Sequence, residues 1–288
     1  MLETEQIAAR LPCWSGPVRP VRLAGGISND SFLVEDGAGK YVVRVNGDVP
    51  VHGVWRANDA ACNRAAAAAG VAPAVHYAGA RAVVVDYIEG RTLGAEDVRI
   101  QANLAKILPL IQRTHVDAYR HLRGPVCGFW PFRVCRDYAN FLDEQGGRMA
   151  PEIARLRAAN ERLENIAGPV SIVLGHNDLL AANFIDDGTR IWLIDWEHAG
   201  LTSPLFDLAN LASNNSLPQA REVWLLEAYF GQPAGEELQR RFLAMKCASL
   251  LREAMWSMVS EYTSALDFDY AAYSRDFLGR FEVEYDRL

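Results

Sequence analysis

The 288-residue sequence predicts an α+β protein with a small β-rich N-terminal lobe and a larger helical C-terminal lobe. Short apolar runs separated by turn residues fill roughly the first ninety positions. Apolar residues at helical spacing dominate after Thr92, and one polar hairpin interrupts this helical part. We therefore expect an N-terminal lobe over residues 1–90, a C-terminal lobe over 91–288 and a hinge at about 86–93.

The N-terminal lobe is expected to contain several strands and one helix. Pro20 cannot donate a hydrogen bond to a central ladder, so the strand around it is typical of a sheet edge. The alanine-rich run from Trp55 to Ala69 has high helix propensity, and Gly70 stands where such a helix would end. The expected strands are PVRPVRLA, SFLVE, YVVRV and RAVVVDYIEG, at residues 17–24, 31–35, 41–45 and 81–90.

The C-terminal lobe is expected to be mainly helical. Residues 95–115 have apolar positions at helical spacing, and Pro109 within them predicts a kink. A second amphipathic helix is expected over 150–167, and the chain from Arg221 onward has an almost continuous helical pattern. Between these segments, residues 172–200 predict a short β system.

Composition and charge exclude several classes of protein. Hydrophobic residues make up 50% of the chain and charged residues 23%, which is ordinary for a globular protein. No apolar run approaches the ~18 residues of a membrane span, and the N-terminus is acidic where a secretory signal is basic. We therefore expect a cytoplasmic protein that does not bind membranes. A net charge of -7 without basic runs argues against nucleic acid as a partner. The oligomeric state is left open, and a homodimer is compatible with the sequence.

A polar knot in an otherwise apolar stretch marks the candidate active site. The stretch LGHNDLLAANFI runs from Leu174 to Ile185, and burying its polar groups is costly unless each finds a partner. Downstream, NFIDDGTRIWLID contains two apolar strands around a DDGT turn, which predicts a β-hairpin. Such a hairpin brings Asn183 and Asp195 to the same open end, and Asp178 lies in the loop that enters it.

These three side chains offer hard oxygen ligands. Carboxylate and amide oxygens suit Mg²⁺, whereas a single histidine without cysteine is a poor basis for a zinc site. Phosphoryl transfer needs a metal at the phosphate oxygens and a carboxylate that accepts the proton of the attacking hydroxyl. We assign Asn183 and Asp195 to the metal and Asp178 to the base. His176 joins the catalytic set mainly as a brace for the loop. The alternative is a polar corner that satisfies its own hydrogen bonds.

The motifs HNDLLAAN and LIDWE resemble the H-x-D-x-x-x-x-N and D-x-E pair of the aminoglycoside phosphotransferase and choline/ethanolamine kinase superfamily. The wording of both motifs looks most like the choline kinase branch. The resemblance extends from about Gly25 to the C-terminus. It implies a two-lobed fold similar to that of a protein kinase, with ATP in the cleft. It also implies base and metal-ligand roles for Asp178, Asn183 and Asp195, in agreement with their chemistry.

The N-terminal lobe offers candidate phosphate contacts. The loop GGISND stands between two expected strands, and glycine N–H groups can approach phosphates without obstruction. An ordinary hairpin turn is the alternative explanation of this loop. Its candidate phosphate-binding residues are Gly25, Gly26, Ser28 and Asn29.

Arg44 in YVVRV falls where kinases carry the strand lysine that grips ATP. Arginine can fork to two phosphate oxygens, although a surface arginine on a strand is the alternative. Its partner on the following helix is expected to be Asp59, which is one methylene shorter than the usual glutamate. By resemblance, VVVDYIEG is the hinge that binds adenine through the backbone of Asp86, Tyr87 and Ile88.

Aromatic residues near the C-terminus are candidates for binding the acceptor. A quaternary ammonium group cannot donate hydrogen bonds, so proteins hold it with aromatic faces and a nearby carboxylate. Glu253 lies one helical turn before Trp256, and Glu197 is expected to point into the same cleft. By resemblance, Trp256 and Tyr273 match choline-pocket aromatics and Glu197 the pocket carboxylate, whereas Glu253 replaces a second tryptophan of animal choline kinases. Ordinary packing is the alternative. The segment supplies four such aromatics, Trp256, Tyr262, Tyr270 and Tyr273.

Together these features predict an ATP- and Mg²⁺-dependent kinase that phosphorylates the hydroxyl of a small amino alcohol, with choline as the leading candidate. One alternative is an aminoglycoside- or thiamine-type kinase, whose acceptor would need a wide acidic cleft. Another is a pseudokinase-like protein that binds nucleotide or amine without transferring phosphate. The intact Asp178, Asn183 and Asp195 argue against the last, and Asp59 is the one feature in its favour.

Overall fold

The structure, a computed structural model, describes residues 3–23 and 30–288. The candidate phosphate-loop residues Gly25, Gly26, Ser28 and Asn29 lie outside these ranges. No helix within the described ranges is both long and apolar enough to cross a membrane.

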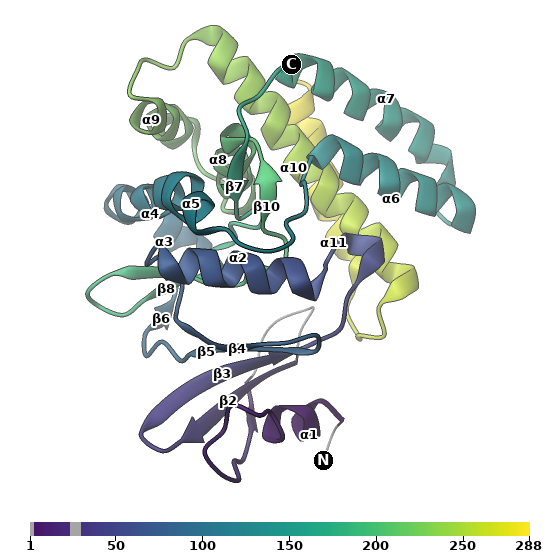
Figure 1. Ribbon diagram of the computed structural model, residues 1–288. Helices are drawn as coiled ribbons and strands as arrows, with labels where there is room; N and C mark the ends of the chain where they lie inside the picture. The colour runs from purple at the N-terminus through teal and green to yellow at the C-terminus, as the bar shows by residue number, and fades with distance from the viewer. Residues whose placement is uncertain (1–2, 24–29) are drawn as a thin grey trace.

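A five-stranded antiparallel sheet forms the N-terminal lobe, in the order β1-β2-β3-β5-β4 (Figure 1). Alternate side chains of β2 and β3, among them Phe32, Val34 and Val43, are buried on the face that α1 (Glu3–Ala9) covers. The expected edge strand forms, but only over two residues that follow Pro20. The strands are β1 (Val21–Arg22), β2 (Asp30–Asp36), β3 (Gly39–Val45), β4 (Val75–Ala78) and β5 (Ala82–Asp86).

Helix α2 (Arg56–Ala68) lies between this sheet and the helical lobe (Figure 1). Its small side chains, such as Ala61 and Ala65, are buried and let neighbouring elements approach closely. The chain leaves the helix through Gly70, whose φ of 66° favours glycine. The helix expected from Trp55 to Ala69 is therefore confirmed.

The C-terminal lobe is helical, as expected. The segment expected to kink at Pro109 is interrupted earlier, at Ile100, whose ψ of 124° is extended backbone. Pro109 itself lies inside a helix. The helices are α3 (Ala95–Arg99), α4 (Gln101–Arg113), α5 (Tyr119–His121), α6 (Pro131–Gln145), α7 (Ala150–Ala167), α8 (Pro204–Asn214), α9 (Gln219–Phe230), α10 (Glu236–Thr263) and α11 (Tyr270–Tyr285), with a π-helical turn over Thr114–Ala118.

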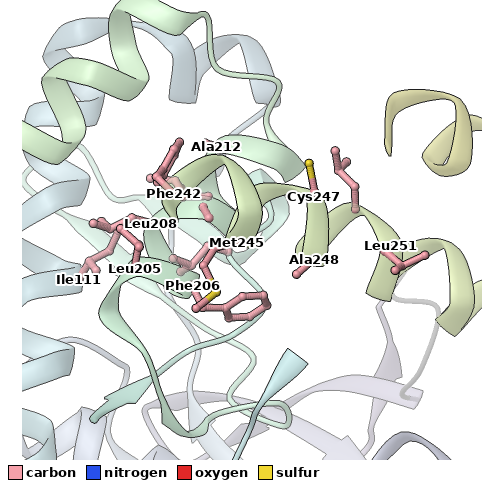
Figure 2. Packing of buried hydrophobic residues seen from close by; sticks show 14 of the residues in the cluster. Ile111, Leu205, Phe206, Leu208, Ala212, Phe242, Met245, Cys247, Ala248 and Leu251 are labelled. Atoms are coloured by element: carbon pink, nitrogen blue, oxygen red, sulfur yellow. The ribbon is translucent and has the colours of Figure 1, made fainter. Parts of the chain in front are cut away.

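Helix α10 is the axis of this lobe. It packs against α6, α7, α8 and α11, so side chains all around its middle turns are buried. Figure 2 shows Met245 of α10 close to Phe206 of α8, and both side chains are fully buried. This packing fixes the orientation of α10, on which several candidate site residues lie.

The short β system of the C-terminal lobe contains the predicted hairpin. Strands β8 (Phe184–Asp186) and β9 (Ile191–Leu193) pair in antiparallel register, with Phe184 opposite Leu193. Strand β6 (Arg91–Thr92) joins β8 and brings the end of the interlobe segment to the hairpin. A second pair consists of β7 (Val173–Gly175) and β10 (Gly200–Thr202).

Asp207 of α8 ties the loop after β7 to the helical core. Its carboxylate is fully buried and accepts the backbone N–H groups of His176 at 2.8 Å and Asn177 at 2.7 Å. It also lies 2.9 Å from Nε2 of His115. Burial acts to raise the pKa of Asp207, but the bonds from His115 and the two N–H groups outweigh it and hold the pKa below its ordinary value.

We expect Asp207→Asn to lower the free energy of unfolding by about 3 kcal/mol, because an amide N–H would face groups that already donate hydrogen bonds. The charged form of Asp207 stabilises the fold fully above the unfolded-state pKa of roughly 4. This contribution declines below that pH and is lost as the pH falls through the lower pKa of Asp207 in the folded protein. Denaturant titrations of the wild type and of Asp207→Asn, at pH 7 and below pH 4, measure the difference between their free energies of unfolding. A difference that stayed constant with pH would contradict this account.

Candidate active site

The open end of the hairpin brings together the three residues assigned to metal and base. Ile194 N donates to Asn183 O at 2.9 Å, which holds the two hairpin ends side by side. The side-chain Nδ2 of Asn183 donates to the backbone oxygen of Asp178 at 2.8 Å. This bond fixes the amide so that its Oδ1 is the atom that can face a cation. Asp195 lies two residues after the end of β9, the second strand of the hairpin.

Two residues of this region have left-handed backbone conformations. Asn177 has a φ of 65° and Asp195 a φ of 67°, which non-glycine residues adopt at a cost of about 1–3 kcal/mol. The Asn177 side chain donates to His198 O at 3.0 Å, and its backbone N–H is held by Asp207. Such strain, maintained by surrounding hydrogen bonds, is characteristic of functional sites.

His176 braces the loop. Its buried ring donates from Nε2 to Ile194 O at 2.9 Å, and Nδ1 accepts the N–H of Asp178 at 3.3 Å. The ring also packs edge-on against Trp196, with centroids 4.8 Å apart. Burial lowers the pKa of His176, so the imidazole is neutral. With both ring nitrogens engaged, the geometry favours positioning over proton transfer.

Arg44 of β3 connects the N-terminal lobe to the hairpin. Its Nη2 lies 2.5 Å from Asp195 Oδ1 and 3.4 Å from Glu197 Oε2. Burial opposes its charge, but Asp195, Asp59 and Glu197 outweigh that effect and raise the pKa of Arg44. Arg44 therefore stays charged where the nucleotide phosphates are expected.

Asp59 was expected to pair with Arg44, but in the described structure its direct partners are others. Its Oδ2 lies 2.9 Å from Arg56 Nη1, and its Oδ1 accepts from Asn63 Nδ2. Arg56 in turn reaches Glu197 Oε2 at 3.0 Å. The shorter aspartate therefore acts on Arg44 through space, and Glu197 is shared between the two arginines.

The donor set at the hairpin fits Mg²⁺ better than a metal held by protein ligands alone. Residues 3–23 and 30–288 contain no group of three or more His, Cys, Asp or Glu side chains that could hold a metal ion. Asp195 and Asn183 offer one carboxylate and one amide oxygen, and Mg²⁺ commonly completes such a set with phosphate and water. The five cysteines are free thiols.

The Asp178 carboxylate lies in an acidic, poorly solvated environment. Burial raises the pKa of Asp178 to about 8, the charge of Arg252 acts to lower it, and Glu253 adds to the rise. Arg252 Nη2 lies 3.7 Å from Asp178 Oδ1. A ligand with positive charge beside Asp178 would favour the ionised carboxylate.

The predicted hinge residues have part of their backbone already bonded. The N–H of Asp86 donates to Ala74 O at 3.0 Å, and that of Tyr87 donates to Lys40 O at 2.9 Å. The side chain of Asp86 pairs with His76. Adenine would therefore depend on the backbone of Ile88 and on carbonyl groups of this segment.

The predicted acceptor aromatics form a cluster that includes one residue missed by sequence reasoning. Trp256 lies edge-on to Tyr270 and Tyr273, with centroid distances of 6.0 and 6.1 Å. Phe268, the missed member, contacts both tyrosine rings. Tyr262 contacts Phe141 instead, and its side chain is exposed. We call Trp256, Phe268, Tyr270 and Tyr273 the aromatic cluster.

Glu253 lies against the aromatic cluster. Tyr273 donates its hydroxyl hydrogen to Glu253 Oε1 at 2.8 Å, and Glu253 Oε2 lies 2.8 Å from Arg252 Nη2. Because Arg252 also faces Asp178, this arginine connects the candidate base to the cluster. Arg252 stands beside Glu253 in LREAMW, but nothing in that pattern distinguishes a site residue from a surface arginine.

His52 is a further residue that sequence reasoning missed. It comes from a 3₁₀ turn of the N-terminal lobe (Pro50–His52), yet its ring lies 5.8 Å from that of Trp256. Its nitrogens face Tyr138 Oη at 3.1 Å and Ser260 Oγ at 3.2 Å. Burial lowers its pKa to about 3, so it contributes a neutral ring. No motif precedes it that could have identified this role.

Comparisons with known proteins identify the family of this chain. A model of the phosphotransferase enzyme family matches residues 20–254. The protein LicA of Haemophilus influenzae is 26% identical over 220 residues, which cover 74% of this chain and 63% of LicA, less than two thirds of its length. Ethanolamine kinase 2 of Mus musculus is 27% identical over 287 residues, covering 89% of this chain and 74% of the relative.

Solved structures share the fold. A choline/ethanolamine kinase family protein from Mesorhizobium loti matches with a TM-score of 0.74 and 26% identity, over 98% of this chain and 93% of that one. Choline kinase LicA from Streptococcus pneumoniae has a TM-score of 0.77 at 22% identity, over 94% of each chain. Since the family model spans most of the sequence, this chain belongs to the phosphotransferase enzyme family, and the proteins it resembles include ethanolamine kinases and a choline/ethanolamine kinase family protein.

Proposed function

We propose that the chain is an ATP- and Mg²⁺-dependent kinase that phosphorylates the hydroxyl of choline or a related amino alcohol. The observation that carries the proposal is the convergence of Asp178, Asn183 and Asp195 at the hairpin end, next to Arg44. Relatives named as ethanolamine kinases support the same class of acceptor. Residues 1–90 and 91–288 would form the two lobes, with the hinge at about 86–93.

In this proposal the chain's own residues divide the work of phosphoryl transfer. Arg44 would bind phosphate oxygens, and Asn183 and Asp195 would hold the metal ion, which would supply positive charge. Asp178 accepts the proton of the hydroxyl group of the amino alcohol. The oxygen of that hydroxyl group forms the new bond to phosphorus, and the bond between phosphorus and the leaving ADP breaks. His176 and Asp207 keep Asp178 in position.

The acceptor would lie against the aromatic cluster. Aromatic faces bind ammonium groups with roughly 0.5–2 kcal/mol each, and the carboxylates of Glu253 and Glu197 add negative charge nearby. These groups favour a small amine over the polycationic acceptor of an antibiotic kinase. Asp59 pairs with Arg56, and Arg44 pairs with Asp195. The absence of a direct Asp59–Arg44 ion pair in the described residues is the feature that favours the pseudokinase-like alternative.

A panel assay tests the function directly. The purified protein is mixed with ATP, Mg²⁺ and either amino alcohols or aminoglycosides, and ADP release is followed. We expect release to require an amino alcohol and to stop when the metal is chelated. Stimulation by aminoglycosides alone would assign a different acceptor, and no turnover with any acceptor would favour a binding-only protein.

We expect Asp178→Ala to reduce kcat by about 10²–10⁴-fold while ATP binding stays nearly unchanged, because only the proton acceptor is lost. Asp195→Ala should instead weaken Mg²⁺-dependent nucleotide binding, which a nucleotide titration with and without metal measures. Asp276→Ala, which removes an exposed carboxylate of α11, is the matched control. Near wild-type rates in both site variants would reject the mechanism.

We expect Trp256→Ala to raise the KM for the amino alcohol about 10-fold with little change in the KM for ATP, since one aromatic face is lost. Steady-state kinetics with each substrate varied in turn provide the measurement. Tyr262→Ala is the control, because Tyr262 lies on the same helix but outside the aromatic cluster. Equal changes in the KM for the amino alcohol in the two variants would show that the aromatic cluster does not bind the amino alcohol.

A further inference from the structure

One carboxylate oxygen beside the aromatic cluster lacks a hydrogen bond. Glu253 is only 5% exposed, and its Oε1 accepts from the Tyr273 hydroxyl. Its Oε2 is buried and has no hydrogen-bond partner among the residues that the structure describes. A buried acceptor without a hydrogen bond destabilises the site, and more so when the group is charged. Whatever binds here removes that destabilisation by donating a hydrogen bond.

The neighbouring Arg252 supplies charge but not this hydrogen bond. Its Nη2 is 2.8 Å from Glu253 Oε2, yet the two groups are not aligned for a hydrogen bond. Nε and Nη2 of Arg252 are likewise buried without hydrogen-bond partners in the described ranges. The charge of Glu253 is therefore balanced within the protein. Glu253 Oε2 therefore lacks an N–H group aligned to donate a hydrogen bond, although a positive charge is already nearby.

The unpaired Oε2 of Glu253 is also close to Asp178, the proposed base. The same Arg252 Nη2 that lies 2.8 Å from Glu253 Oε2 lies 3.7 Å from Asp178 Oδ1. The two carboxylates are thus near enough for one two-carbon amino alcohol to place its hydroxyl on Asp178 and its ammonium on Glu253. Trp256, one helical turn from Glu253, would then cover the remaining face of the amine.

We propose that Glu253 is a specificity-determining residue that accepts an N–H hydrogen bond from the acceptor ammonium, so that primary to tertiary amino alcohols are preferred over a quaternary one. This inference rests on the proposed function, because it takes the acceptor to be an amino alcohol. A site that hydrogen-bonds its substrate rejects an analogue without the donor, since the buried group of the protein is then left unpaired. Choline presents only methyl groups to Glu253.

A methylation series separates hydrogen bonding from charge. Ethanolamine, N-methylethanolamine, N,N-dimethylethanolamine and choline all carry one positive charge at neutral pH and the same hydroxyl. The unpaired Oε2 of Glu253 needs one donor, so we expect kcat/KM to change little until the last N–H is lost. Between dimethylethanolamine and choline we expect a fall of about 10–100-fold.

Variants test the assignment to Glu253. Glu253→Met keeps a similar volume without the carboxylate, and we expect it to reduce the last step of the series to less than about threefold. Tyr273→Phe, which leaves the carboxylate in place, should retain the step. Glu237→Met, the same substitution at an exposed position of α10, is the control and should behave as the wild type.

The outcomes distinguish the inference from the function on which it rests. Wild-type kcat/KM for choline equal to or above that for dimethylethanolamine would overturn the role of Glu253 while leaving an amino alcohol kinase in place. Phosphorylation of none of the four amines would overturn the proposed function itself. Thermal unfolding checks that the variants are folded. If Glu253→Met does not fold, the methylation series with the wild-type protein decides whether loss of the last N–H group lowers kcat/KM.

Discussion

The carboxylate of Asp207 lies under the loop that carries Asp178 and accepts two of its backbone N–H groups. These bonds hold Asn177 in a left-handed conformation, from which the chain turns toward the hairpin. His176 then donates to the backbone oxygen of Ile194, just beyond the second strand of the hairpin, so this bond connects the loop to the hairpin. The position of every candidate catalytic group in the C-terminal lobe therefore depends on one buried charge that α8 presents from the core.

Ion pairs across the lobes set the electrostatics of the site. Arg44 and Arg56 come from the N-terminal lobe and bind Asp195 and Glu197 of the C-terminal lobe. Arg252 plays a comparable part within the C-terminal lobe, between Asp178 and Glu253. Carboxylates still outnumber guanidinium groups in this set. Burial raises the pKa of the Asp178 carboxyl to about 8, and a positively charged ligand would favour its ionised form, so this set suits the metal ion and the ammonium group proposed as occupants.

The parts of this structure that the sequence predicts are those encoded by local pattern. The hairpin follows from two apolar strands around DDGT, and α2 follows from an alanine run that ends at Gly70. The partners of Asp59 could not be predicted, because they depend on how α2 is rotated against the sheet. His52 and Arg252 were missed for a similar reason. One reaches the aromatic cluster from another lobe, and the other lies on a helix buried on all sides, where no polar face marks the site.

The arrangement of Arg252 has a consequence for how recognition relates to chemistry. The same guanidinium group faces the carboxylate proposed to bind the amine and the carboxylate proposed to accept the proton. An amino alcohol that donates a hydrogen bond to Glu253 weakens the electrostatic attraction between Glu253 and Arg252. It thereby changes the electrostatic effect of Arg252 on Asp178. Binding energy at the amine would then act in part on the transition state, where it raises kcat instead of only lowering KM. On this argument, a poor amine is a slow substrate as well as a weakly bound one, because the two carboxylates are connected through one side chain.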